Sequence, residues 1–367
     1  MEGPYSARFP SSSVGETSRR ATVIRGAADE RARSVPCVSA RTAMDHRPDP
    51  RFAHRPVMAD EIVDLFAPVP AGWVVDATLG GAGHARALLA AHPHLRVLGV
   101  DQDPSALEAA RARLAPFGER VRTERARFDD LPAVTRRTID GAPVVGVLFD
   151  LGVSSPQLDR AERGFSYRHD APLDMRMDPD GERTAADVVN TYPEARLAAV
   201  LRDLGDERFA GRIARAVVAA RPVDTTGQLV ELVREAIPAP ARRRGGHPAK
   251  RTFQALRIEV NEELAILPAS IDAAVDLLVP GGRIAVLAYH SGEDRIVKAR
   301  LRSAATGDCV CPPGLPCVCG ATPTVRLLKQ GAWKPRADEV AANPRAESAR
   351  LRAAERLAPA DDPGAAS

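Results

Sequence analysis

The chain contains little cysteine, few aromatic residues and no long apolar run. Five cysteines in 367 residues are too few for a disulfide-stabilised scaffold, so a cytoplasmic protein is the default expectation. No apolar run approaches the roughly 20 residues that a membrane-spanning helix needs, and the N-terminus lacks the apolar core of a secretory signal. We therefore predict no membrane contact. Aromatic residues at 4% also argue against a dense platform for stacking on bases.

An excess of one charge sign is also missing. The net charge of +3 excludes a histone-like mass of positive charge, although a local basic patch is compatible with it. Only four lysines occur, and genome base composition explains the abundance of arginine and alanine as well as function does. At 44% hydrophobic and 27% charged residues, the composition is that of a globular protein, and the length allows roughly two domains.

Both ends of the chain lack periodic patterns. Residues 1–49, rich in Ser, Arg, Pro and Gly, are predicted to be a disordered N-terminal extension, and residues 358–367 a disordered tail. Met44 lies just before the first segment with a regular pattern, which makes it a candidate translation start.

Between these ends, short apolar runs alternate with helical patterns. Four runs resemble buried strands and occupy residues 73–75, 95–100, 144–149 and 283–288. The first three lead directly into Asp76, Asp101 and Asp150. Helical patterns at 85–91 and 105–114 separate the first runs. The alternation predicts a doubly wound, mostly parallel α/β sheet.

The last of these strands begins more than 130 residues beyond Asp150, far more than one crossover helix requires. Amphipathic helical patterns fill the interval, at residues 194–204, 207–220, 227–237 and 253–267. We therefore predict a sheet domain in two segments, residues 50–160 and 253–357. A helical substrate-binding domain is predicted between them, at residues 161–252.

A glycine-rich loop, from Asp76 to His84, follows the first strand and opens a helix. Its glycines let the backbone approach a ligand, although a tight turn without a ligand explains them too. The loop lacks the Gly-x-Gly-x-x-Gly pattern of dinucleotide sites, since Arg86 occupies the third glycine position. Asp101 ends the second strand about 20 residues later, where an acid accepts hydrogen bonds from ribose hydroxyls. Together they predict a nucleoside-type ligand, and Asp103 is predicted to cap the next helix.

Asp150 and Gln157 follow the strand at residues 144–149, which in a doubly wound order lies beside the first strand. Both side chains could therefore face the same ligand. Ser154, Ser155 and Pro156 between them fit turn chemistry equally well. No Gly-x-Ser-x-Gly elbow surrounds these serines, which argues against a serine hydrolase.

Several long motifs are shared with a known family. They are residues 54–58 (HRPVM), 76–84, 99–104, 149–159, 164–178 (GFSYRHDAPLDMRMD), 201–209 (LRDLGDERF), 247–263 (HPAKRTFQALRIEVNEE), 278–288, 290–298 and 343–346 (NPRA). Over residues 52–356 the chain resembles the RsmH (MraW) family of S-adenosylmethionine-dependent ribosomal RNA methyltransferases. The resemblance implies a Rossmann-like class I methyltransferase fold. It also implies methyl transfer from S-adenosylmethionine to the N4 amine of a cytidine in the decoding centre of bacterial 16S rRNA.

The resemblance also implies which residues hold the cofactor. Carried over onto this sequence, the positions are Ala82, Gly83, His84, Asp101, Phe128, Asp150 and Gln157. Phe128 could pack on adenine or belong to the ordinary core. The chain departs from the family at Gly81-Ala82, where Arg/Ala-Gly is more usual, and at Gly292, where leucine is frequent.

The implied partner is 16S rRNA or the small ribosomal subunit, and one loop suits such a partner. Five fixed positive charges fall within ten residues, at Arg242, Arg243, Arg244, Lys250 and Arg251. Such a loop suits contacts with phosphates, although a solvated charged loop is the alternative. Phe165 and Tyr167 could stack on bases or anchor the inserted domain.

The cytosine N4 amine is a poor nucleophile because its lone pair is delocalised into the ring. The enzyme therefore has to align the amine, accept its hydrogen and remove a proton, and the base has to leave its stack. Asp150 is the first candidate for the contact with the amine, but the sequence leaves the catalytic base open. His290, Glu293 and Asp294 could line the same cleft, although Glu293 and Arg295 fit a solvated helix start equally well.

Four of the five cysteines are paired as C-x-C…C-x-C, at Cys309, Cys311, Cys317 and Cys319. Four thiolates could bind zinc, but the spacing is tighter than the usual C-x₂-C. Reduced cysteines on a Pro/Gly-rich loop, or a labile disulfide, explain the pattern too. The predicted site residues therefore include no metal ligand.

Two other functions fit parts of the sequence. A Rossmann-fold, NAD-dependent oxidoreductase would share the alternating pattern, but the missing Gly-x-Gly-x-x-Gly disfavours it. A non-catalytic RNA-binding protein of ribosome assembly would share the basic loop, and methyl transfer from a labelled donor would distinguish the two.

Overall fold

The computed structural model describes residues 56–154, 157, 160–242, 246–312 and 317–359. The predicted extension at 1–49, Met44, residues 243–245 and the last eight residues lie outside the described residues. The boundaries of the predicted domains stay a prediction. None of the helices in the described ranges is both long and apolar enough to cross a membrane.

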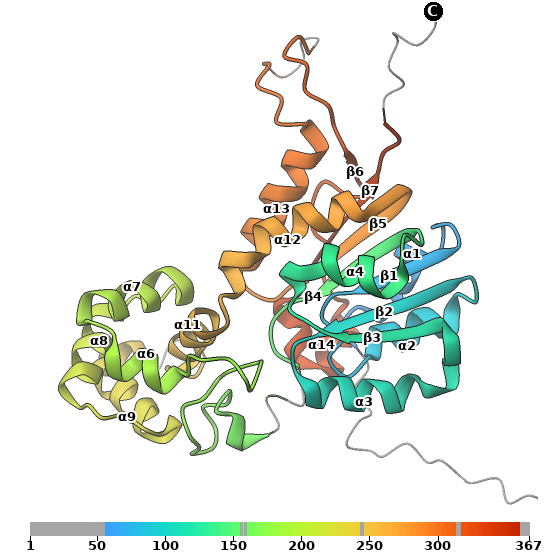
Figure 1. Ribbon diagram of the computed structural model, residues 1–367. Coiled ribbons are helices and arrows are strands. Elements are labelled where there is room, and N and C mark those ends of the chain that lie inside the picture. The colour runs from blue at the N-terminus through green and yellow to red at the C-terminus, as the bar shows by residue number, and fades with distance from the viewer. Residues whose placement is uncertain (1–55, 155–156, 158–159, 243–245, 313–316, 360–367) are drawn as a thin grey trace, which may run out of the picture. The chain divides into compact units, whose positions relative to one another are not determined.

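A seven-stranded sheet has the strand order β3-β2-β1-β4-β5-β7-β6 (Figure 1). The strands are β1 (Gly72–Asp76), β2 (Leu95–Asp101), β3 (Val121–Arg125), β4 (Val144–Asp150), β5 (Leu278–Ala288), β6 (Val325–Leu327) and β7 (Arg350–Arg356). β1 to β5 are parallel, and β7 pairs antiparallel with both β5 and β6. The predicted doubly wound, Rossmann-like methyltransferase fold is confirmed.

Helices cover both faces of the sheet (Figure 1). One face packs against α1 (Ala59–Phe66), α2 (Gly83–Ala91) and α3 (Pro104–Leu114), and the other against α4 (Leu131–Ile139), α12 (Glu263–Leu277) and α13 (Ser291–Thr306). Neighbouring strand residues point to opposite faces, so Val74 and Leu148 join the first core while Val75 and Val147 join the second. Residues buried on both faces explain why the strands read as continuous apolar runs rather than alternating ones.

Between β4 and α12 the chain forms a helical insertion with its own core. Its helices are α6 (Ala185–Thr191), α7 (Glu194–Gly205), α8 (Ala210–Ala219), α9 (Thr226–Ala236), α10 (Ala239–Arg242) and α11 (Lys250–Asn261). The predicted helices at 194–204 and 227–237 match α7 and α9. The predicted helix at 207–220 begins later, at Ala210, because the Glu207 carboxylate accepts the backbone N–H of Phe209 in a turn before it.

One predicted helix was wrong in its continuity. Residues 253–267 are divided between α11 and α12, because Glu262 adopts a left-handed backbone with φ of 55° and ends α11. Phe253 and Leu256 of α11 belong to the core of the insertion, whereas Leu267 of α12 belongs to the core of the sheet. The predicted boundary between residues 252 and 253 therefore falls inside α11.

Close packing at β4 allows a stability test. A methyl group built on Gly146 would lie 2.5 Å from Cε1 of Phe66 and 3.1 Å from Cγ2 of Val74, whereas one on Gly211 of α8 meets nothing within 4 Å. We expect Gly146→Ala to lower the free energy of unfolding by about 1–3 kcal/mol through overpacking. The matched Gly211→Ala should raise it by about 0.4–1 kcal/mol. Urea unfolding of both variants checks this, and equal effects would contradict the packing described.

Candidate active site

Three aspartates end neighbouring parallel strands. Asp76, Asp101 and Asp150 are the last residues of β1, β2 and β4, and β1 lies between the other two strands. Parallel strands end at one edge of a sheet, and in open α/β sheets this edge holds the ligand. The structure therefore brings Asp101 and Asp150 together with the glycine-rich loop, as the strand pattern predicts.

The glycine-rich loop is held directly against β2. The backbone N–H of Gly80 donates to Oδ2 of Asp101 at 2.7 Å, and that of Leu79 donates to the carbonyl of Val100 at 3.0 Å. Gly80 needs its freedom here, since its φ is +48°. Ala82, where the family more usually has glycine, also has a left-handed backbone, with φ of 56°, and precedes α2. This chain therefore accepts backbone strain at that position.

Asp101 keeps acceptor capacity beyond these contacts. Its Oδ1 accepts the backbone N–H of Asp103 at 2.9 Å, and its Oδ2 accepts that of Gly80. A carboxylate has about four lone-pair sites, so both oxygens can still accept from ribose hydroxyls. Burial raises the pKa of Asp101 to about 6, because the hydrogen bonds from the two N–H groups compensate only in part.

Asp103 caps α3 as predicted and also joins two later segments. It accepts the backbone N–H of Ser105 at 2.9 Å, the Nε2 of Gln157 at 3.3 Å and a guanidinium N–H of Arg163 at 2.9 Å. Gln157, buried, also accepts the backbone N–H of Ser154 with its Oε1. The structure thus places Gln157 beside Asp103, two residues after the end of β2. Sequence reasoning missed Arg163, which carries no motif signal of its own.

Asp150 gathers side chains from distant parts of the chain. The Tyr289 hydroxyl donates to its Oδ1 at 2.7 Å, Nδ1 of His84 lies 3.4 Å from its Oδ2, and its backbone N–H donates to Oγ1 of Thr78 at 2.6 Å. His84 Nε2 lies 2.9 Å from the carbonyl of Val57, which can only accept. His84 therefore donates its Nε2–H to that carbonyl and turns Nδ1 toward the carboxylate.

Asp76, Asp101 and Asp150 form an acidic edge of the sheet, and their carboxyl groups ionise less readily than free ones. Burial raises the pKa of Asp76 to about 7, and the charge of Asp150 adds to the rise. Burial likewise raises the pKa of Asp150, against the opposing effects of His84 and Tyr289. Sequence reasoning missed Asp76 and Tyr289 as parts of the site, although each lies at a strand end like the residues it did select.

The first turn of α13 holds the backbone of Tyr289 in place. His290 caps the helix, and the Glu293 carboxylate accepts the backbone N–H of Tyr289 at 2.7 Å. Glu293 is only 2% exposed, so it does not belong to a solvated helix start. Asp294 turns instead to Arg352 of β7, at 2.7 and 3.0 Å.

Gly292, which departs from the family pattern, lets this helix start approach α12. A methyl group there would lie 3.1 Å from both Leu264 and His290. Phe128, just after β3, packs edge-on against Phe149 with ring centroids 5.8 Å apart. This contact is what an ordinary core residue makes, and the adenine contact stays a prediction.

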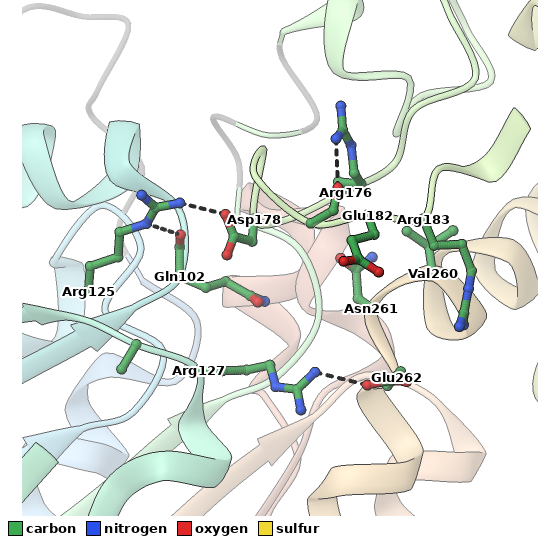
Figure 2. A pocket seen from close by; sticks show the side chains of 12 residues that line it. Gln102, Arg125, Arg127, Arg176, Asp178, Glu182, Arg183, Val260, Asn261 and Glu262 are labelled. Carbon is green, nitrogen blue, oxygen red and sulfur yellow. Dashed lines mark hydrogen bonds and ion pairs between the residues drawn. The ribbon is translucent and has the colours of Figure 1, made fainter. Parts of the chain in front are cut away.

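A cavity of about 540 Å³ opens next to Asp101. Gln102, Arg125 and Arg127 line it from the sheet, and Arg176, Asn261 and Glu262 line it from the insertion (Figure 2). Ion pairs bridge the two sides, from Arg125 to Asp178 at 2.6 Å and from Arg127 to Glu262 at 2.9 Å. The glycine-rich loop and Asp150 do not line this cavity, which adjoins Asp101 through Gln102.

The basic loop is only partly described. Arg242, Lys250 and Arg251 are exposed, and Arg243 and Arg244 lie outside the described residues. Arg242 and Arg251 each donate one N–H to a backbone carbonyl, of Ile237 and Asp206 respectively, both at 2.8 Å. Within the described ranges their other N–H groups make no hydrogen bond, so they are available to an anionic partner.

The two aromatic residues considered for base stacking lie within the insertion. Phe165 is buried in its core, and Tyr167 stacks on His247 with ring centroids 4.4 Å apart. Tyr167 also meets Phe253 edge-on at 5.9 Å. Of the two roles predicted for these residues, anchoring the insertion is the one that these contacts support.

Comparisons with known proteins identify the family. A model of the MraW methylase family matches residues 51–357. This chain belongs to the MraW methylase family. A protein of Thermobifida fusca named Ribosomal RNA small subunit methyltransferase H is 57% identical over 86% of this chain and 97% of that protein. A protein of the same name from Heliobacterium modesticaldum is 49% identical over 83% of this chain and 99% of that protein.

Solved structures give weaker similarities. An rRNA methylase from Streptococcus thermophilus has 13% identity and a TM-score of 0.36, covering 82% of this chain and 94% of that one. A protein from Streptococcus mutans, described as a methyltransferase and solved with SAH, has 13% identity and a TM-score of 0.38, covering 81% and 97%. The family assignment rests on the sequence matches. As a member of this family, the chain is a methyltransferase whose cofactor is S-adenosylmethionine.

The residues at the sheet edge fit this cofactor. S-adenosylmethionine carries ribose hydroxyls and two positively charged groups. The edge offers carboxylates with raised pKa values, whose ionised forms are not fully stabilised by the protein alone. The buried Oγ of Ser154 has no hydrogen-bond partner among the described residues, and its Cβ lies close to the glycine-rich loop at Gly80. An unpartnered polar atom at this place is consistent with a polar ligand.

The raised pKa of Asp101 predicts how binding depends on pH. Only the ionised carboxylate accepts two hydroxyl hydrogens, so a ligand that uses them binds best above the pKa of about 6. We expect the Kd of S-adenosylhomocysteine to be flat above pH 7 and to rise by up to about tenfold per pH unit below 6. Calorimetric titrations at pH values from about 5 to about 8 measure this dependence.

The variant Asp101→Asn should bind S-adenosylhomocysteine weakly at every pH, and its Kd should no longer change with pH near about 6. Asp272→Asn is a matched control, because Asp272 pairs with Arg300 on the helices α12 and α13 away from the strand ends. It should keep both the affinity and the pH profile. A Kd for the unmodified protein that does not change across this pH range would contradict the role of Asp101.

Proposed function

We propose that the chain transfers a methyl group from S-adenosylmethionine to the N4 amine of a cytidine in the decoding centre of 16S rRNA. The names of its relatives support a small-subunit rRNA substrate. The observation that carries the proposal is the placement of Asp150, which lies between His84 and Tyr289 at the edge that also carries Asp101. A carboxylate so placed can serve both the cofactor and an amine that must lose a proton.

The strand order speaks against the oxidoreductase alternative. Nicotinamide-binding Rossmann folds have the order 3-2-1-4-5-6, whereas this sheet places the antiparallel β7 between β5 and β6. The first loop also lacks the third glycine of a pyrophosphate site, with Arg86 in its place. The non-catalytic alternative offers no reason for three carboxylates with raised pKa values at the ligand-binding edge.

The cofactor is proposed to lie between the glycine-rich loop and the aspartates. Ala82, Gly83 and His84 would approach it from the loop, and Asp101 would accept its ribose hydroxyls. Phe128, Asp150 and Gln157 complete the proposed set. When bound, S-adenosylmethionine supplies a methyl group that is already activated as a sulfonium.

Asp150 is proposed to act on the amine itself. One carboxylate oxygen accepts a hydrogen of the N4 amine, which directs the nitrogen lone pair away from that hydrogen and toward the methyl group. The nitrogen lone pair would form the new bond to the methyl carbon while the carbon–sulfur bond breaks and leaves a neutral thioether, and one amine hydrogen would pass to the carboxylate as a proton. The raised pKa of Asp150 favours this transfer, and the Tyr289 hydroxyl, which donates at 2.7 Å, keeps the carboxylate in position.

The RNA is proposed to reach the edge from the side of the arginine-lined cavity. The cavity adjoins Asp101 through Gln102, and four arginines line it: Arg125, Arg127, Arg176 and Arg183. Its volume of about 540 Å³ suits a single nucleotide taken out of its stack. Phosphate contacts by Arg242, Arg243, Arg244, Lys250 and Arg251 would position the rest of the RNA without reading its sequence.

Replacing the proposed proton acceptor tests the reaction. We expect Asp150→Asn to lower the rate of methyl transfer to small subunits by about 10²–10⁴-fold, because an amide cannot take up the proton. Its Kd for S-adenosylhomocysteine should change far less than its rate. The measurement is incorporation of labelled methyl groups, followed by nuclease digestion and identification of N4-methylcytidine by mass spectrometry.

The control for this test is Asp203→Asn, since Asp203 is an exposed carboxylate that pairs only with its neighbour Arg202 in the contacts described. It should keep the full rate. Full activity of Asp150→Asn would exclude the proton-acceptor role. A labelled nucleoside other than N4-methylcytidine would exclude the proposed target.

Removing charge from the basic loop tests the RNA contact. We expect Arg242→Ala and Lys250→Ala each to weaken binding of a 16S rRNA fragment and to reduce the slope of log K against log salt by about 1. Fluorescence anisotropy at several salt concentrations measures both quantities. Arg137→Ala on α4, an exposed arginine paired with Asp130, is the matched control and should leave the slope unchanged. Equal slopes for all variants would show that the loop does not contact phosphates.

A further inference from the structure

Four cysteine side chains meet in the connection between α13 and β6. The Sγ atoms of Cys309, Cys311, Cys317 and Cys319 all lie within 4.8 Å of one another. The closest separations are 3.4 Å between Cys317 and Cys319, 3.5 Å between Cys309 and Cys317, and 3.6 Å between Cys309 and Cys319. The sequence pairs these residues two by two, but the structure makes them one group.

The backbone on both sides of the group is fixed by the fold. α13 ends at Gly307 with φ of +59°, and a methyl group there would lie 2.5 Å from the backbone of Thr322. The backbone N–H of Thr324 donates to the carbonyl of Ala304 at 2.8 Å. The outgoing and returning segments are therefore held side by side at the end of α13, and the cysteines between them face one another.

No apolar core accounts for this arrangement. Val310 and Val318, the middle residues of the two C-x-C motifs, are 86% and 89% exposed, and they are the most exposed large apolar side chains among the described residues. Short segments that bury little apolar surface usually depend on disulfides or a metal for a defined structure. The sulfurs are thus the groups through which the two motifs interact.

The separations fit a metal better than they fit disulfides. A disulfide brings two sulfurs to about 2.05 Å and would divide four cysteines into pairs. Here one sulfur, that of Cys317, lies at nearly equal distances from two others, and the cysteines are free. Zinc–sulfur bonds of about 2.3 Å in a tetrahedron separate the sulfurs by about 3.8 Å, close to the observed values.

We propose that Cys309, Cys311, Cys317 and Cys319 bind one zinc ion as a closed, tetrahedral Cys₄ site. The backbone N–H of Val318 donates to Sγ of Cys311 at 3.4 Å, and hydrogen bonds of this kind orient and stabilise metal-bound sulfur. Four protein ligands leave no position for water or substrate, so the ion is structural. α13 spans about 24 Å for its sixteen residues, which separates this site from Tyr289 at the other end.

Metal analysis of the full chain tests the proposal. The protein, purified under reducing conditions without chelator, should contain about one zinc per chain. Cys317→Ser and Cys319→Ser should each lower this below about a tenth of an equivalent. Cys37→Ser is the matched control, because Cys37 is the fifth cysteine and lies outside the described residues, and it should keep the zinc of the unmodified protein.

A second measurement on the unmodified chain does not depend on any variant folding. Cobalt(II) added to the metal-free protein should give the intense visible absorption of tetrahedral thiolate coordination, and zinc should abolish it. Absence of both zinc and this spectrum would overturn the proposal, as would two disulfides found by alkylation and mass spectrometry. None of these measurements uses methyl transfer, so their outcomes do not depend on the proposed reaction.

Discussion

Asp76, Asp101 and Asp150 end three neighbouring strands, so the parallel sheet forces their carboxylates toward one edge. Burial removes hydration from all three carboxylates, which is the main reason why their pKa values are raised, and neighbouring carboxylates add to the rise. The rest of the site can be understood as partial compensation. The backbone N–H groups of Gly80 and Asp103 donate to Asp101, and the side chains of His84 and Tyr289 contact Asp150. The charge that remains uncompensated suits a positively charged ligand.

The compensation reaches the helical insertion. Arg257 of α11 pairs with Glu263 at 2.7 and 2.8 Å and lies 3.9 Å from Glu293. Although burial opposes it, hydrogen bonding and charge from His290, with a further contribution from Arg257, lower the pKa of Glu293. Glu293 therefore stays ionised and holds the backbone of Tyr289, which in turn donates to Asp150. A shift of α11 would therefore change the position of Tyr289 and its hydrogen bond to Asp150 through this series of contacts.

The strand pattern was enough to predict the edge but not its contacts. Asp101 and Asp150 could be found because parallel strands must end together. The hydrogen bond from Tyr289 to Asp150 joins residues 139 positions apart, and no local sequence pattern predicts it. The break at Glu262 was missed for a related reason. Apolar spacing continues through it, whereas its left-handed backbone and its ion pair with Arg127 depend on the tertiary structure.

α13 connects the two parts of the molecule that carry proposed chemistry, and its own caps show that they are separable. Its first turn is completed by a capping box between His290 and Glu293, and its last by the left-handed Gly307. Both helix ends are therefore satisfied without any ion. The acidic edge depends on the first turn, and the four cysteines lie beyond the last one. Loss of a metal at the far end would leave the contacts of Tyr289 and Asp150 intact, so zinc content and cofactor affinity should vary independently.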